Sequence, residues 1–168
     1  MKENNPFDLT FTIFLCFFMI VTYPFLKTDN FESGCTDNIS TTLVNKFYHD
    51  SISHLFIDVI TLLFLYELEK SMGSTGIIVV FLTSLLLVSI FETTLVNIYP
   101  NVTCSSGLFG VFVAMGTFDV LKSVPNKYII VGLVIITAII VNMINNNIFH
   151  YMSDYIGFFV GLLLALTC

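Results

Sequence analysis

Long apolar runs without a single charge are the feature that most constrains this chain. Leu9 to Leu26 and Ser71 to Phe91 contain no charged side chain. A membrane-spanning helix needs about 20 predominantly apolar residues. The whole chain agrees, because 56% of its 168 residues are hydrophobic and 11% are charged, whereas a soluble domain is about 25% charged. These values exclude a soluble globular domain, a disordered chain and a small disulfide scaffold.

The apolar runs predict an all-α, polytopic membrane protein, a bundle of six transmembrane helices in a single domain over residues 1–168. The polar segment 27–50 is expected to be a loop, and Glu67–Lys70 a charged turn between two spans. The expected helices cover residues 9–26, 51–66, 71–91, 106–121, 128–144 and 151–168.

The lysines predict the orientation of this bundle, because short cytoplasmic loops carry an excess of lysine. With six spans and a cytoplasmic N-terminus, four of the six lysines lie inside: Lys2, Lys70, Lys122 and Lys127. The loop 27–50, which carries Lys27 and Lys46, then lies on the outer or lumenal side. Two sequons, at Asn38 and Asn101, fall on that same side, where glycosylation requires them to be.

Charge and cysteine content exclude some classes of function. The net charge is −6 and the chain has no arginine, so it lacks the basic surface of a nucleic-acid-binding protein. The four cysteines show no CxxC or metal-ligand spacing. We therefore expect no cofactor and no metal, and the lipid bilayer as the surroundings.

Ionisable side chains at membrane depth are rare, and by default they face the bundle interior and mark function. His54 and Asp58 are four residues apart and share one face of the expected helix 51–66. Asp154 lies one turn into 151–168, His150 precedes it by four residues, and Glu92 is near the end of the third span. A structural hydrogen bond is the alternative for each of them.

Small residues mark two further places. Ser105, Ser106 and Gly107 open the expected helix 106–121, where a serine is more often a cap than a nucleophile. Gly157 and Gly161 form a GxxxG face that lets two helices approach closely.

Taken together, these residues resemble the rhomboid intramembrane serine proteases, over nearly the whole chain. Phe47–Asp58 resembles the family's F-x-H-x-x-x-x-H-x-x-x-N segment, and Glu69–Gly73 resembles its E-x-x-x-G turn. Cys104–Gly107 is similar to G-x-S-G, and Asp154–Gly161 to H-x-x-G-x-x-x-G. The resemblance implies a six-helix fold, Ser106 as the nucleophile, and packing at Gly107, Gly157 and Gly161.

Three positions depart from the family pattern. The resemblance puts the general-base histidine at Asp154 and the oxyanion-binding asparagine at Asp58, next to His54 in the same site. Cys104 stands where the first glycine of G-x-S-G is expected. A serine needs a base of matched pKa, and the pKa of an aspartate carboxyl is ordinarily about 4. An ionised carboxylate also cannot donate a hydrogen bond to an oxyanion.

These departures leave two main hypotheses. The first is a pseudoprotease, a rhomboid-like protein with absent or impaired proteolysis that binds transmembrane segments of client proteins. In it, Asp58 or Asp154 would form a structural ion pair with His54. The second is an active serine-type endopeptidase that uses Ser106 to cleave transmembrane substrates, with Asp154 or, as a substitute base, His150. A metal site at His54, Asp58 and Asp154 is a weaker alternative, because no ligand spacing supports it. A transporter or channel is also weaker, because the spans contain no repeated pair of broken helices.

Overall fold

The computed structural model describes residues 10–26, 36–99, 107–123 and 152–167. These residues are helical, with no strand among them, which confirms the predicted all-α class. The helices are α1 (Phe11–Leu26), α2 (Ile39–Asn45), α3 (Ile52–Phe64), α4 (Tyr66–Ile98), α5 (Phe109–Ser123) and α7 (Met152–Thr167). The predicted span 128–144 lies outside the described residues.

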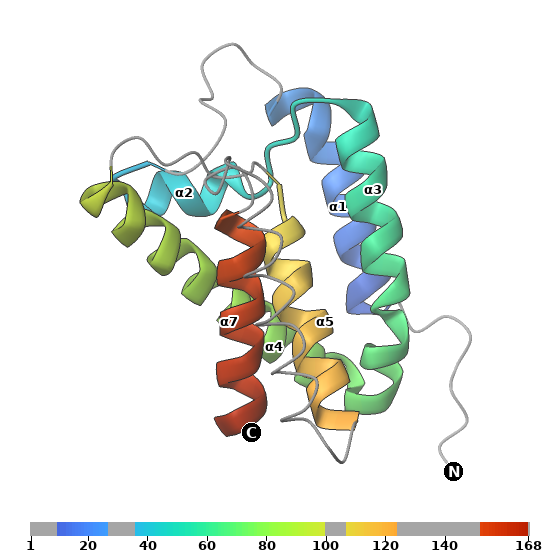
Figure 1. Cartoon of the computed structure of the whole chain (residues 1–168). Helices are drawn as coiled ribbons and strands as arrows, with labels where there is room; N and C mark the ends of the chain where they lie inside the picture. The colour runs from blue at the N-terminus through green and yellow to red at the C-terminus, as the bar shows by residue number, and fades with distance from the viewer. Residues whose placement is uncertain (1–9, 27–35, 100–106, 124–151, 168) are drawn as a thin grey trace, which may run out of the picture.

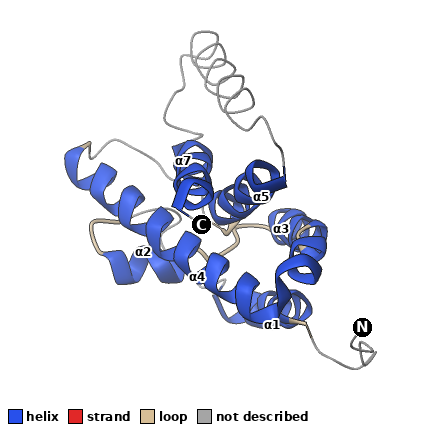
Figure 2. Ribbon diagram, turned by 90° about the horizontal axis from the view of Figure 1, so that it is seen from below, coloured by secondary structure: helices blue, strands red, loops and turns tan. Residues whose placement is uncertain are grey.

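Two pairs of adjacent helices make up the described bundle. α1 packs beside α3 and α5 packs beside α7, and α4 runs past both pairs (Figures 1 and 2). Among the described helices, α4 is the one that is long and apolar enough to cross a membrane. Helices α1 and α3 and most of α7 are apolar but shorter.

The segment between the second and third predicted spans has another conformation than predicted. Residues 67–70, predicted to be a charged turn, are helical and belong to the first part of α4, which begins at Tyr66 and continues to Ile98. The chain instead bends at Gly73, whose φ of 75° and ψ of 162° are non-helical. A positive φ of this kind favours glycine. The 33 residues of α4 are therefore two helical stretches that meet at a kink at Gly73.

Glu69, one of the charged residues before this bend, has a structural role. Its buried carboxylate accepts the backbone N–H groups of Phe11 at 2.8 Å and Thr12 at 2.9 Å. Ser74 donates its hydroxyl to the same carboxylate at 2.7 Å. A negative charge at a helix N-terminus satisfies its unpaired N–H groups, so Glu69 fixes the start of α1 against α4.

Helix α2 lies in the segment predicted to be a loop. It is too short and polar to appear in a search for apolar spans, and its start is set by Asn38, whose side chain accepts the N–H groups of Ser40 and Thr41. Thr42 is buried and hydrogen-bonds Thr93 of α4 at 3.1 Å. The loop is therefore held against the C-terminal half of α4.

Glycines bring α5 and α7 into close contact. A Cβ at Gly157 would overlap the backbone of Gly110, and a Cβ at Gly161 would overlap the carbonyl of Ala114. The predicted GxxxG face therefore packs on α5, one turn further along than Gly107.

Candidate functional site

The candidate site is built first from the start of α3. Ser51 caps this helix, since its side chain accepts the N–H of His54. His54 Nδ1 lies 3.0 Å from Asp50 Oδ1, one turn earlier. Partial burial alone would raise the pKa of Asp50. The hydrogen bonds from His54 and Ser51 and the attraction of His54 together outweigh this effect, so the pKa of Asp50 lies below its usual range. Asp50 thus fixes the ring of His54 through Nδ1 and leaves Nε2 for the site.

A second histidine pairs with Asp58. His49 Nε2 lies 2.9 Å from Asp58 Oδ2, and both side chains are fully buried. The other ring nitrogen, Nδ1, lies 3.1 Å from the carbonyl oxygen of Phe47. Because a carbonyl only accepts, Nδ1 carries a proton. One further proton then lies between Nε2 and Oδ2, on either atom. In both cases this proton makes the hydrogen bond between Asp58 Oδ2 and His49.

The start of α5 completes this contact. The Leu108 N–H donates to Asp58 Oδ2 at 3.0 Å, and Gly107 before it has a φ of 84°. A Cβ at Gly107 would lie 2.9 Å from Asp58 Oδ2 and 3.0 Å from His54 Nε2. Only glycine allows both this backbone angle and this approach. The fold therefore brings His54 and Asp58 against the residue that follows Ser106.

A third group of charges lies where α2, α4 and α7 meet. Lys46 Nζ lies 2.7 Å from Glu92 Oε1 and 2.6 Å from Oε2, and the two side chains are 3% and 0% exposed. Asp154, in the first turn of α7, is partly buried, and Lys46 and Glu92 are the charged groups that act on it. The base position thus lies within electrostatic range of a lysine and a glutamate.

The family model described as the Rhomboid domain matches residues 37–168. The chain belongs to the rhomboid family. It is accordingly an integral membrane protein. No curated protein and no solved structure matches the chain.

Not every predicted site residue of this rhomboid can be located. Ser106, Cys104 and His150 lie outside the described residues. His54 and Asp58 lie together at Gly107, and Asp154, in the first turn of α7, is close enough to Lys46 and Glu92 to feel their charges. In the described ranges no three His, Cys, Asp or Glu side chains gather as a metal site would require.

The predicted ion pair of His54 with Asp58 or Asp154 is wrong. His54 pairs with Asp50, and Asp58 pairs with His49. The spacing offered a signal for the first pair, since Asp50 precedes His54 by four residues, as side chains on adjacent helical turns do. The pairing of Lys46 was signalled by Glu92, because a carboxylate at membrane depth needs a partner of opposite charge.

Proposed function

We propose that this rhomboid-like membrane protein lacks competent proteolysis and binds transmembrane segments of client proteins. The observation that supports this is the state of Asp58, which occupies the family's oxyanion position. Its Oδ2 already receives a hydrogen bond from the Leu108 N–H and shares a proton with His49. Asp58 therefore has no donor to offer a developing oxyanion.

Asp58 lacks a free donor whether the proton shared with His49 lies on Nε2 or on Oδ2. If His49 is the imidazolium, Asp58 is a carboxylate, which accepts hydrogen bonds and repels negative charge. If Asp58 is protonated at Oδ2, that proton is donated to His49 Nε2. Oδ1 carries no proton in either arrangement, and it is buried without a hydrogen-bond partner in the described part of the chain. Loss of one oxyanion donor typically costs about 10²–10³ in rate.

The base position supports the same proposal. Asp154 replaces the imidazole with a carboxylate, and a carboxyl whose pKa is ordinarily about 4 is a weak base toward a serine hydroxyl. The charges of Lys46 and Glu92 also act on this carboxylate. Base and oxyanion hole act as a unit, so two altered positions impair catalysis more than either one does.

A client segment would bind beside α3. This helix packs mainly on α1 and touches α5 only sparsely, whereas α5 and α7 pack closely (Figure 2). Ile57, next to Asp58, is 52% exposed. In this proposal the six predicted spans form one bundle with a cytoplasmic N-terminus, and the 27–50 segment lies on the outer or lumenal side.

Photo-crosslinking tests client binding. A benzoylphenylalanine is placed at Ile57, and in a matched control at Val79 of α4, which is 58% exposed. Each variant is reconstituted with a biotinylated single-span transmembrane peptide. We expect a crosslinked adduct at position 57 and background at position 79. Equal crosslinking at both positions would refute a defined binding face.

A second candidate is an active intramembrane serine endopeptidase with His54 as its base. The observation that favours it is the Asp50–His54 contact, which orients the ring as an acidic residue orients the histidine of a catalytic triad. Ser106 would transfer its proton to His54 Nε2 as it attacks the substrate, and Asp50 would stabilise the imidazolium.

Labelling with a fluorophosphonate probe separates the two candidates. The proposed function predicts no labelling that depends on Ser106. The second candidate predicts labelling that is lost in Ser106→Ala and His54→Gln, reduced in Asp50→Asn and retained in Asp154→Asn. Labelling that is lost in Asp154→Asn but retained in Asp50→Asn would instead assign the base to Asp154.

A further inference from the structure

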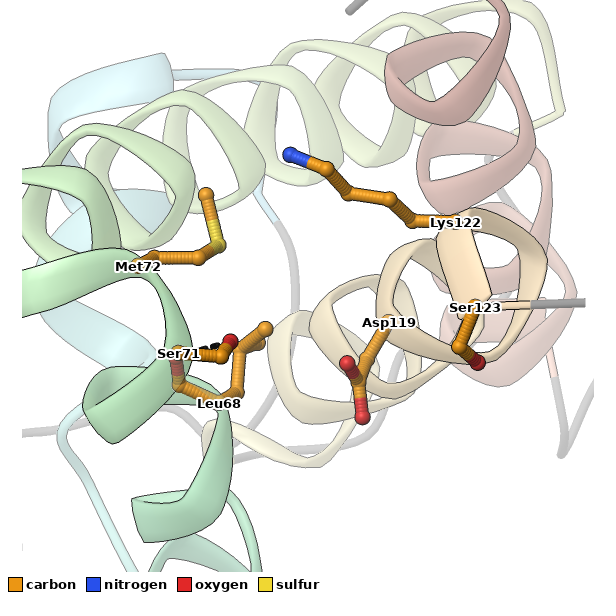
Figure 3. A pocket seen from close by; sticks show the side chains of 6 residues that line it. All are labelled: Leu68, Ser71, Met72, Asp119, Lys122 and Ser123. Atoms are coloured by element: carbon orange, nitrogen blue, oxygen red, sulfur yellow. Dashed lines mark hydrogen bonds between the residues drawn. The ribbon is translucent and has the colours of Figure 1, made fainter.

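A cavity lies between α4 and α5, at the ends of these helices away from α2 (Figures 1 and 3). Its volume is about 460 Å³, and Leu68, Ser71 and Met72 of α4 face Asp119, Lys122 and Ser123 of α5 across it. It shares no residue with the site at Gly107. Leu68 is buried, whereas Ser71, Lys122 and Ser123 are exposed, so the cavity opens to the surface.

Among the residues that the structure describes, one cation of the cavity is unpaired. Of the three lysines in the described residues, Lys46 pairs with Glu92 and Lys70 with Glu67, but Lys122 has no carboxylate within ion-pair distance. Lysines at helix ends usually extend toward water. Lys122 instead reaches across the cavity toward α4 (Figure 3), and its Nζ lies 5.2 Å from the centre of the Phe118 ring. This cation–π contact holds the ammonium in place.

The remaining polar groups of the cavity accept hydrogen bonds. Asp119 has no ion-pair partner among the described residues and points away from Lys122 (Figure 3). Ser71 donates its hydroxyl proton to the carbonyl of Leu68, and Ser123 donates to that of Val120. Toward a ligand both hydroxyl oxygens are therefore acceptors. The cavity thus offers one cation, Lys122 of α5, and three acceptor groups, which are Asp119 and Ser123 of α5 and Ser71 of α4.

We propose that this cavity binds a phosphate that carries a primary amine, the phosphoethanolamine group. The phosphate oxygens would accept from Lys122 Nζ, and the three N–H donors of the ammonium would bond to Asp119, Ser71 and Ser123. A purely anionic ligand would leave the Asp119 charge unpaired, and a purely cationic ligand would leave that of Lys122. The cavity lies at the ends of helices of a membrane protein, where the headgroup of a phosphatidylethanolamine would be presented.

Native mass spectrometry of the full chain in detergent tests this assignment. The probes are dioleoyl phosphatidylethanolamine, phosphatidylglycerol and phosphatidylcholine, together with soluble O-phosphoethanolamine. We expect phosphatidylethanolamine to bind more tightly than the other two lipids, because glycerol has no charge for Asp119 and a quaternary ammonium has no N–H. Binding of soluble phosphoethanolamine at equal affinity would assign the site to a small metabolite, and binding of the lipid alone would assign it to the membrane.

The variants identify the site. Lys122→Gln and Asp119→Asn should each weaken phosphatidylethanolamine binding by about tenfold, the loss of one charge-assisted hydrogen bond. Lys70→Gln, at an exposed lysine near the start of α4, should not change it. Phosphatidylethanolamine should also slow acetylation of Lys122 in the unmodified protein, and that of Lys70 not at all. Equal binding of all three lipids, or binding that neither variant weakens, would overturn the proposal.

Discussion

The close approach of α7 to α5 at Gly157 gives a sharp test of the packing. Gly157→Ala adds one methyl group that would overlap the Gly110 carbonyl and lie 2.9 Å from its carbon. Carbon atoms in contact normally lie about 3.5–4.0 Å apart. The two helices would therefore have to separate by about 0.6–1.1 Å along this line, and the atoms in the way are backbone, which cannot rotate aside.

Overpacking of this kind costs about 1–3 kcal/mol, and we expect Gly157→Ala to lose that much stability. Gly116→Ala is the matched control on the facing helix, because a Cβ there meets nothing within 4 Å. It should be neutral or gain up to about 1 kcal/mol from helix propensity. The assay is reversible unfolding in detergent micelles, followed by circular dichroism. Wild-type stability in Gly157→Ala, or equal loss in both variants, would refute the close packing of α5 on α7.

Three further predictions concern the polar contacts. Lys46→Met leaves the Glu92 carboxylate buried and unpaired, so it should lower the free energy of unfolding by about 3–5 kcal/mol, and adding Glu92→Leu should restore most of it; additive losses would contradict pairing. Asp50→Asn should cost under about 1 kcal/mol at pH 7, because this carboxylate is largely exposed. Folding lowers the pKa of Asp50, so its contribution to stability is present above the ordinary aspartate pKa and is lost as the pH falls through the lower folded pKa. The stabilities of wild type and Asp50→Asn should therefore converge in acid denaturation. A stability difference that persists in acid would refute the ion pair. Gly107→Ala introduces a residue that disfavours a φ of 84° and crowds His54, and it should destabilise the protein by about 1–3 kcal/mol in thermal melts; an unchanged melting temperature would argue against that backbone conformation.

The sequence predicted the helical class because its apolar runs are long and free of charge, and burial in lipid or protein imposes the same hydrophobicity. It missed α2 for the converse reason. That helix is short and polar, and it is held by single contacts such as Thr42 to Thr93, which no periodicity reveals. Residues 67–70 were predicted to be a turn because Glu69 resembles a loop residue, although it is buried as the cap of α1.

The site was predictable in its residue types more than in its pairings. His54 and Asp58 stood out as ionisable groups in an apolar segment, and the structure brings both to Gly107. Which histidine pairs with which carboxylate depends on where the backbone turns before α3, and that turn places His49, rather than His54, against Asp58. Lys46 could be matched to Glu92 only once α2 was placed on α4.

Cleavage of a transmembrane substrate in proteoliposomes shows whether Asp58 and Asp154 prevent proteolysis. The comparison includes wild type, Asp58→Asn with Asp154→His, and that double variant with Ser106→Ala. We predict no Ser106-dependent product from wild type. The double variant should gain cleavage, because it restores base and oxyanion donor together, and Ser106→Ala should abolish that gain. Ser106-dependent cleavage by the wild-type protein would contradict the account, because Asp58 would then not prevent catalysis.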